Sequence, residues 1–161
     1  MISRTVQKPQ AVSEQLHIAR ISIDATPEVV RELVSTKQGI EDWWTARPVG
    51  GTDRLGGSML IFFGGDDPSA VMDVIEDTPE RVVWRCVEGP RDWKGTEISF
   101  RLDPTPDGGT TMLFTHAGWR ESSDFMANCS TNWGAYLTGL KQGAEGSGFT
   151  PYPAGEISRW S

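Results

Sequence analysis

The stretch from 122 to 142 limits the fold more than any other, because its pattern is typical of one long helix. Its apolar side chains recur at steps of three and four and therefore line one helical face. These residues are Phe125, Cys129, Trp133, Tyr136, Leu137 and Leu140. Ser122 or Ser123 can cap the first turn, and Gly143 suits the position just past the end. At about 1.5 Å per residue such a helix reaches roughly 30 Å, so a partner surface of domain width is expected.

The same helix is unusual in two respects. Gly134 and Gly139 lie inside it, at a cost of about 1 kcal/mol each relative to alanine, which predicts that something approaches the backbone closely. From Phe125 to Leu140 there is also no charged residue, although a surface helix usually has a charged outer face. Either this face is neutral and solvated, or it is a self-association surface that produces a homodimer. The sequence leaves both open.

The composition favours one aromatic-rich domain. A chain of 161 residues suits a single domain with a full core. Hydrophobic residues make up only 37%, but they include seven Trp and six Phe, so a few large side chains are expected to dominate burial. A net charge of −7 argues against a general affinity for nucleic acid or anionic membranes.

The expected location is the cytoplasm. Cys86 and Cys129 match no zinc or CxxC spacing and are interpreted as small buried hydrophobic residues, as in a reducing compartment. No apolar run approaches the roughly 20 residues needed to span a bilayer, and the N-terminus has no signal-peptide pattern. No membrane partner is therefore expected.

The first part of the chain predicts one strand and two short helices. Residues 16–23 alternate as a half-buried strand. Thr26 and Pro27 then provide a cap and a favourable first residue for a helix that ends near 35. Four apolar residues of this helix are expected to be buried, namely Val29, Val30, Leu33 and Val34. A second short helix is predicted at 38–44.

The middle of the chain predicts an antiparallel meander. A short edge strand is expected at 46–49. Five strands follow, separated by turn residues, at 58–63, 69–76, 81–88, 97–102 and 110–117. Short loops between successive strands favour antiparallel pairing. The predicted fold class is therefore α+β, with one face of a curved antiparallel sheet covered by the long C-terminal helix.

The predicted organisation is a flexible arm at 1–14, one domain at 15–145 and a Gly/Pro-rich tail at 146–161. The arm is polar and aperiodic. The tail is expected to be extended, although Phe149, Tyr152 and Trp160 predict that it docks on the domain.

Several segments together resemble the Hsp90-ATPase-activator-like branch of the START-like, or Bet v 1-like (SRPBCC), superfamily. The stretch TMLFTHAGW at 111–119 is similar to the family's last strand, and Trp133 with Leu137 and Leu140 is similar to its closing helix. Four other stretches are similar to earlier parts of the family pattern: DATPEVV at 24–30, WW at 43–44, LGGS at 55–58 and MDVIEDTPERVVW at 72–84. The likeness covers about residues 16 to 143.

This resemblance implies a helix-grip fold, with two short helices after the first strand and a curved sheet wrapped around the long helix. It also implies a cavity between sheet and helix that accepts apolar small molecules. The candidate ligand-binding residues are Trp44, Met72, Trp84, Phe100, Phe114, His116, Trp133, Tyr136 and Leu137. The alternative is that these side chains simply fill the core. Trp44 and Trp119 are expected near the rim of the cavity, and no cofactor is expected.

His116 is the candidate catalytic residue, because alternation places it on the inner face with Met112 and Phe114. A neutral imidazole could orient a ligand or act as an acid or base. The alternative is a hydrogen-bonded structural histidine near the strand end. No Ser/His/Asp or Cys/His order is recognisable, so nucleophilic catalysis has no support.

Other chemistries lack a supporting pattern. Asp73 and Glu76 fall on opposite faces of one strand and could act together only across a bulge. No cluster has metal-ligand spacing, so no metal is expected. The glycines between 51 and 57 lack the ending of a phosphate-binding loop and are interpreted as turn residues.

The function predicted from these features is binding of a hydrophobic or aromatic small molecule. A polyketide-cyclase-like or other pocket enzyme is the first alternative. Activation of an Hsp90-type chaperone ATPase is the second, and it is not favoured, because the extra N-terminal domain of such activators is not seen in this chain.

Overall fold

The computed structural model describes residues 15–160 except 46, 150, 153 and 155, so the predicted arm at 1–14 lies outside the described residues. The helices and strands follow in this order: β1 (Gln15–Ile23), α1 (Pro27–Ser35), α2 (Lys37–Trp43), β2 (Gly50–Gly51), β3 (Ser58–Ile61), β4 (Ala70–Asp77), β5 (Arg81–Glu88), β6 (Glu97–Pro104), β7 (Thr110–Trp119) and α3 (Asp124–Ala144).

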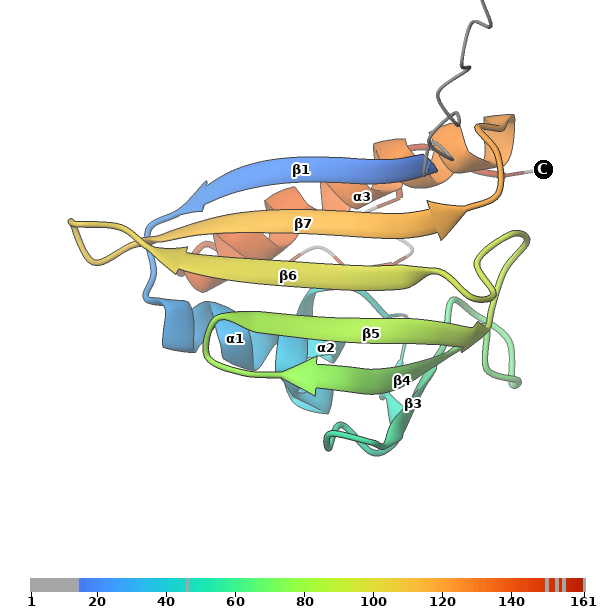
Figure 1. Ribbon diagram of the computed structural model, residues 1–161, viewed down its shortest axis with the longest axis horizontal. Coiled ribbons are helices and arrows are strands. Elements are labelled where there is room, and N and C mark those ends of the chain that lie inside the picture. The colour runs from blue at the N-terminus through green and yellow to red at the C-terminus, as the bar shows by residue number, and fades with distance from the viewer. Residues whose placement is uncertain (1–14, 46, 150, 153, 155, 161) are drawn as a thin grey trace, which may run out of the picture.

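The strands form one antiparallel sheet in the order β1-β7-β6-β5-β4-β3-β2. The helices all lie on one face of this curved sheet, with α3 behind β1 and β7, α1 against β5 and β6, and α2 beside α1 (Figure 1). This arrangement is the helix-grip α+β fold that the sequence predicted. The ring centroids of Phe114 on β7 and Trp133 on α3 lie 4.7 Å apart, so the aromatic side chains of sheet and helix do face one another.

The two short helices share one residue as their boundary. Thr36 ends α1 and caps α2, and its side-chain oxygen accepts a hydrogen bond from the Gly39 amide. Gly39 lies inside α2 against the Glu32 carbonyl oxygen, where a Cβ would not fit. Trp43 Nε1 donates to the Leu33 carbonyl at 2.7 Å and ties the two helices together. Val29, expected to be buried, is exposed because it lies on the outer side of α1.

The edge strand and the end of the long helix differ from the prediction. The edge strand is Gly50–Gly51 rather than 46–49, and its two residues pair with Leu60 and Met59; position 46 lies outside the described residues. Helix α3 starts after Ser123, as capping predicted, but continues through Gly143 to Ala144. The phenyl ring of Phe149 packs where a Cβ of Gly143 would lie, so this glycine makes room for the tail instead of ending the helix.

The close approach expected at the glycines of α3 is absent at Gly134, on the outer side of the helix. Gly134 faces open space, with nothing within 4 Å of a Cβ placed there. Gly139 is buried. The exposed positions of the uncharged stretch carry small side chains, namely Ala127, Ser130, Thr131, Gly134 and Thr138.

Asp73 and Glu76 do not act as a carboxylate pair. The pairing of β4 with β5 shifts between Val74 and Glu76, so a bulge does lie between them. Each carboxylate nevertheless has its own partner: Asp73 accepts from Ser58 Oγ at 2.5 Å, and Glu76 pairs with Arg81 at 2.9 Å. Among the described helices, none is long and apolar enough to cross a membrane.

Candidate functional site

Tryptophan rings form the centre of the molecule. The ring of Trp44 stacks on Trp84 at 5.6 Å and on Trp133 at 5.2 Å between centroids, with interplanar angles of 17° and 30°. Trp43 and Trp93 lie beside it, nearly parallel, at 5.9 and 6.3 Å. These five residues come from α2 and the residue after it, β5, the β5–β6 loop and α3, so the cluster joins every layer of the fold.

His116 lies behind this cluster in a hydrogen-bond chain whose direction is determined by its end members. Trp133 Nε1 can only donate, and it donates to His116 Nδ1 at 3.0 Å. Thr96 Oγ1 donates to the Trp93 carbonyl and therefore accepts from His116 Nε2 at 2.8 Å. The imidazole is thus neutral, with its proton on Nε2 and no free nitrogen. Of the two roles left open for His116, this geometry favours the structural one.

Burial lowers the pKa of both histidines. His116 is fully buried, and the loss of solvation, with a smaller contribution from His17, holds its pKa well below the usual value. His17, which pairs with His116 across β1 and β7, has its pKa lowered to about 4 by burial. Its Nε2 atom has no hydrogen-bond partner among the described residues. Both imidazoles are therefore neutral near pH 7.

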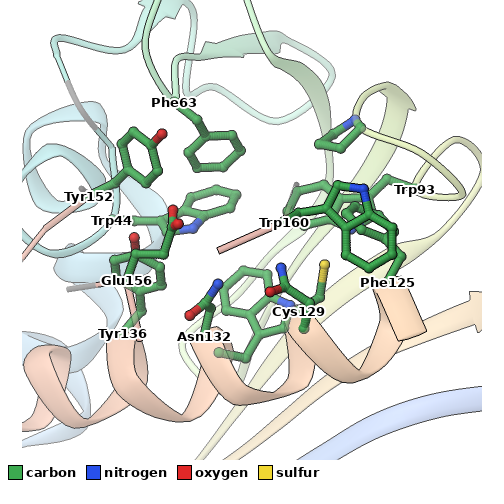
Figure 2. A pocket seen from close by; sticks show the side chains of 13 residues that line it. Trp44, Phe63, Trp93, Phe125, Cys129, Asn132, Tyr136, Tyr152, Glu156 and Trp160 are labelled. Atoms are coloured by element: carbon green, nitrogen blue, oxygen red, sulfur yellow. The ribbon is translucent and has the colours of Figure 1, made fainter. Parts of the chain in front are cut away.

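A pocket with a volume of about 270 Å³ lies beside the tryptophan cluster, between α3, two loops of the sheet and the C-terminal tail. Figure 2 shows Cys129 and Asn132 rising from α3 toward the open space, with Phe63 and Tyr152 on one side and Phe125 and Trp160 on the other. Its described lining residues are Trp44, Phe63, Pro90, Trp93, Phe125, Asn128, Cys129, Asn132, Trp133, Tyr136, Tyr152, Glu156 and Trp160. Eight of these thirteen are aromatic, so the site suits an apolar or planar ligand.

Three of the predicted ligand-binding residues line this pocket: Trp44, Trp133 and Tyr136. The other six are fully or almost fully buried in the core and do not line it: Met72, Trp84, Phe100, Phe114, His116 and Leu137. Strand alternation correctly places them on the inner face, but side chains of α2 and α3 fill the space above them. The pocket therefore lies at the loop end of the fold rather than between sheet and helix. Trp119, expected at the rim, is buried against Phe125 and His116.

The tail closes one side of the pocket, as its aromatic residues predicted. The Asn132 side chain binds it from α3: Oδ1 accepts from the amides of Ile157 and Ser158, each at 2.9 Å, and Nδ2 donates to the Ser158 carbonyl at 2.7 Å. The Tyr152 amide donates to the Trp44 carbonyl at 3.1 Å. These contacts hold Tyr152, Glu156 and Trp160 at the pocket.

The polar groups of the pocket are few. Tyr136 Oη is buried and has no hydrogen-bond partner among the described residues. Burial raises the pKa of Tyr136, and the Glu156 carboxylate and Tyr152 add to this effect. Burial also raises the pKa of Cys129 to about 11, although the interaction of the thiol with the Trp93 side chain lowers this pKa by a smaller amount. Both groups are therefore protonated at neutral pH, and the thiol is not an activated nucleophile.

Sequence reasoning missed most of the pocket wall. Phe63 was expected in the strand at 58–63 but lies past the end of β3, Trp93 lies in the β5–β6 loop, and Glu156 and Trp160 lie in the tail. In the loop and the tail, no periodicity assigns a face to a side chain. The available signal was the aromatic content of these otherwise polar, Gly/Pro-rich segments. Within the described residues, no group of three or more His, Cys, Asp or Glu could hold a metal ion.

Comparison with solved structures places the chain among small helix-grip proteins. The Aha1 dimer from Colwellia psychrerythraea is 32% identical, with a TM-score of 0.72 over 83% of this chain and 98% of that one. CalU16 from Micromonospora echinospora is 22% identical, with a TM-score of 0.65 over 86% of each chain. SSP2350 from Staphylococcus saprophyticus is 16% identical, with a TM-score of 0.64 over 82% and 92%. The last two likenesses concern the fold alone.

The comparison with curated proteins gives no match. The family described as "Activator of Hsp90 ATPase homolog 1-like protein" matches residues 24–145. This range runs from the residue after β1 to the residue after α3 and includes the tryptophan cluster and the helix wall of the pocket. The chain therefore belongs to the Activator of Hsp90 ATPase homolog 1-like family.

Proposed function

We propose that this protein binds a hydrophobic or aromatic small molecule in the pocket beside Trp44 and Trp133. The observation that carries the proposal is the aromatic wall of the 270 Å³ pocket, with the buried hydroxyl of Tyr136 left without a partner among the described residues. Such a hydroxyl is costly in an apolar site unless a ligand or water hydrogen-bonds to it. An apolar cavity with a few well-placed polar groups is the usual form of a small-molecule site.

The proposal is tested by filling the pocket from its helical side. Asn128 is half-buried and lines the pocket, so Asn128→Phe puts a ring into the cavity without removing a core side chain. We expect this variant to keep the wild-type melting temperature and to weaken ligand binding at least tenfold. Because Trp44, Trp93, Trp133 and Trp160 line the site, titration of a panel of small aromatic compounds can be followed by tryptophan fluorescence.

Ser130→Phe is the matched control, since it adds the same ring on the exposed side of the same helix. Equal binding by the two variants would contradict the proposal. Native mass spectrometry of the purified wild-type protein supplies an independent test: a co-purified small molecule should be present in the wild type and depleted in Asn128→Phe.

The pocket also favours ligand binding over the two alternative functions. The predicted catalytic residue does not serve this cavity, since His116 is engaged on both nitrogens and does not line it. The family description refers to activation of the Hsp90 ATPase, a role that no specific feature of the described residues favours. A chaperone ATPase assay distinguishes that role from binding.

Self-association through the uncharged outer face of α3 stays a prediction. The first solved structure compared above is described as a dimer, and the exposed face of α3 carries Ser130, Gly134 and Thr138. Gly134→Arg should convert a dimer to a monomer, as measured by light scattering at micromolar concentration, because it places a charge on the small-residue surface. Gln142→Arg, exposed on the same helix outside the uncharged stretch, should leave the mass unchanged. A monomeric wild type would contradict the prediction.

A further inference from the structure

The pocket carries one negative charge and no positive charge among its described lining residues, which indicates the class of ligand it binds. This inference rests on the function proposed above. Glu156 is the single carboxylate among the described lining residues, and none of those residues is Lys, Arg or His. Over the described chain, the salt bridges involve other residues and leave the Glu156 carboxylate without an ion-pair partner. The pocket thus combines one negative charge with an aromatic wall and no compensating cation among its described residues.

Aromatic rings line the pocket on several sides, and their electrostatic character depends on which part of each ring meets a ligand. The face of an aromatic ring is electrostatically negative, while its edge and any N–H group are positive. Trp133 turns its N–H away from the pocket, because Nε1 donates to His116 in the core at 3.0 Å. Trp44 stacks beside it at 5.2 Å. The rings of Tyr152 and Phe63, whose centroids lie 5.5 Å apart in an edge-to-face arrangement, line another part of the pocket wall. Rings therefore approach the cavity from several directions.

Tyr136 supplies a second polar group beside Glu156. Its hydroxyl is buried without a hydrogen-bond partner among the described residues, and it lines the same pocket as Glu156. The two side chains are close enough for the carboxylate to influence the pKa of the phenol. The phenol oxygen can direct its lone pairs at a positively charged group, or accept a hydrogen bond where that group carries an N–H, and the carboxylate can neutralise the charge.

We infer that the pocket binds an organic cation, meaning an ammonium group carried on a small apolar or aromatic body, with Glu156 as its counter-charge and the surrounding rings as a cation–π cage. Cages of aromatic side chains recognise alkylated ammonium groups in this way. An anionic ligand would instead meet an unpaired carboxylate without any described lining cation. The net charge of −7 on the whole chain also favours binding of a cation, because it raises the local concentration of cations around the protein.

Two probes of the same shape test the inference. Benzyltrimethylammonium carries a positive charge, and neopentylbenzene is its uncharged isostere with carbon in place of nitrogen. Both are titrated into the full-length protein at low ionic strength, with tryptophan fluorescence as the signal. The cation should bind at least tenfold more tightly than the isostere, and its affinity should fall as salt is added, because Glu156 is only partly buried.

Glu156→Gln keeps the shape of the side chain and removes the charge, so it should reduce the ratio of the affinity for the cation to that for the isostere severalfold. Glu121→Gln is the control for net charge, since Glu121 is exposed and does not line the pocket; it should leave the preference unchanged.

The outcomes separate this inference from the proposed function. If the isostere binds as tightly as the cation, or if Glu156→Gln does not alter the ratio of the two affinities, the inference fails and the proposed function stands. The inference also fails alone if other neutral aromatic compounds bind and neither probe does. If no compound in the panel binds, both fail.

Discussion

Trp44→Ala is expected to lower the free energy of unfolding by about 3–5 kcal/mol, the usual cost of removing a large buried aromatic side chain. Trp44 is 2% exposed and lies within ring contact of Trp84, Trp133 and Phe63. Its removal leaves a cavity that rigid neighbours from separate elements cannot fill. Because small domains have about 5–15 kcal/mol of stability in total, denaturant titration should show a large shift of the unfolding midpoint.

The control is Trp160→Ala, which removes the same ring from a position that is 48% exposed and contacts Phe125 at the pocket. We expect a cost of about 1 kcal/mol or less there. Similar losses in both variants would show that the tryptophan cluster does not hold the layers together.

Acid should destabilise the protein through its two buried histidines. In the folded state the pKa of His17 is about 4, and that of His116 is also held well below 6.5. The unfolded chain therefore binds more protons than the folded chain as the pH falls below about 6.5, so stability decreases from there downward. At about 1.4 kcal/mol per unit of pKa difference, His17 alone should cost roughly 2–3 kcal/mol between pH 6.5 and pH 4.

Urea unfolding at a series of pH values measures this effect. His17→Phe keeps an aromatic ring beside Trp119, and His116→Gln keeps a side chain that can accept from Trp133 and donate to Thr96. Neither replacement titrates, so the double variant should lose much less stability than the wild type over pH 6.5 to 4.5. Parallel pH profiles for the two proteins in that range would contradict the assignment of neutral buried histidines. Above pH 7 the profiles should be parallel in any case, because both imidazoles are then neutral in both states.

The fold was predictable from periodicity because its elements are long and strongly patterned. The alternation of Met112, Phe114 and His116 placed them on the inner face, and all three are buried. The steps of three and four along α3 placed Trp133 and Leu137 toward the sheet, where they are buried as well. Each of these is a local property: a side chain's face follows from its position within its own strand or helix.

The hydrogen-bond chain through His116 was only partly predictable from the sequence. The sequence offered a histidine near the end of an inner-facing strand, with a structural role as one alternative. Its partners Trp133 and Thr96 are 17 and 20 residues away in the chain. Which side chains meet over such separations depends on the packing of α3 over β7 and on the course of the β5–β6 loop, neither of which has a local signal.

The sequence by itself determined the α+β class, the antiparallel sheet covered by the long helix, the order of the elements and the aromatic character of the core, since these depend on hydrophobic pattern and turn residues. The helix-grip arrangement followed from the family resemblance. Only the tertiary structure decided where the pocket lies and that Glu156 is its single described carboxylate. The physical reason is that the pocket wall comes from irregular segments, including Phe63, Trp93 and Trp160, whose positions depend on where loops and tail dock. Asn132 helps to fix the position of the tail through hydrogen bonds to residues more than twenty positions away in the chain.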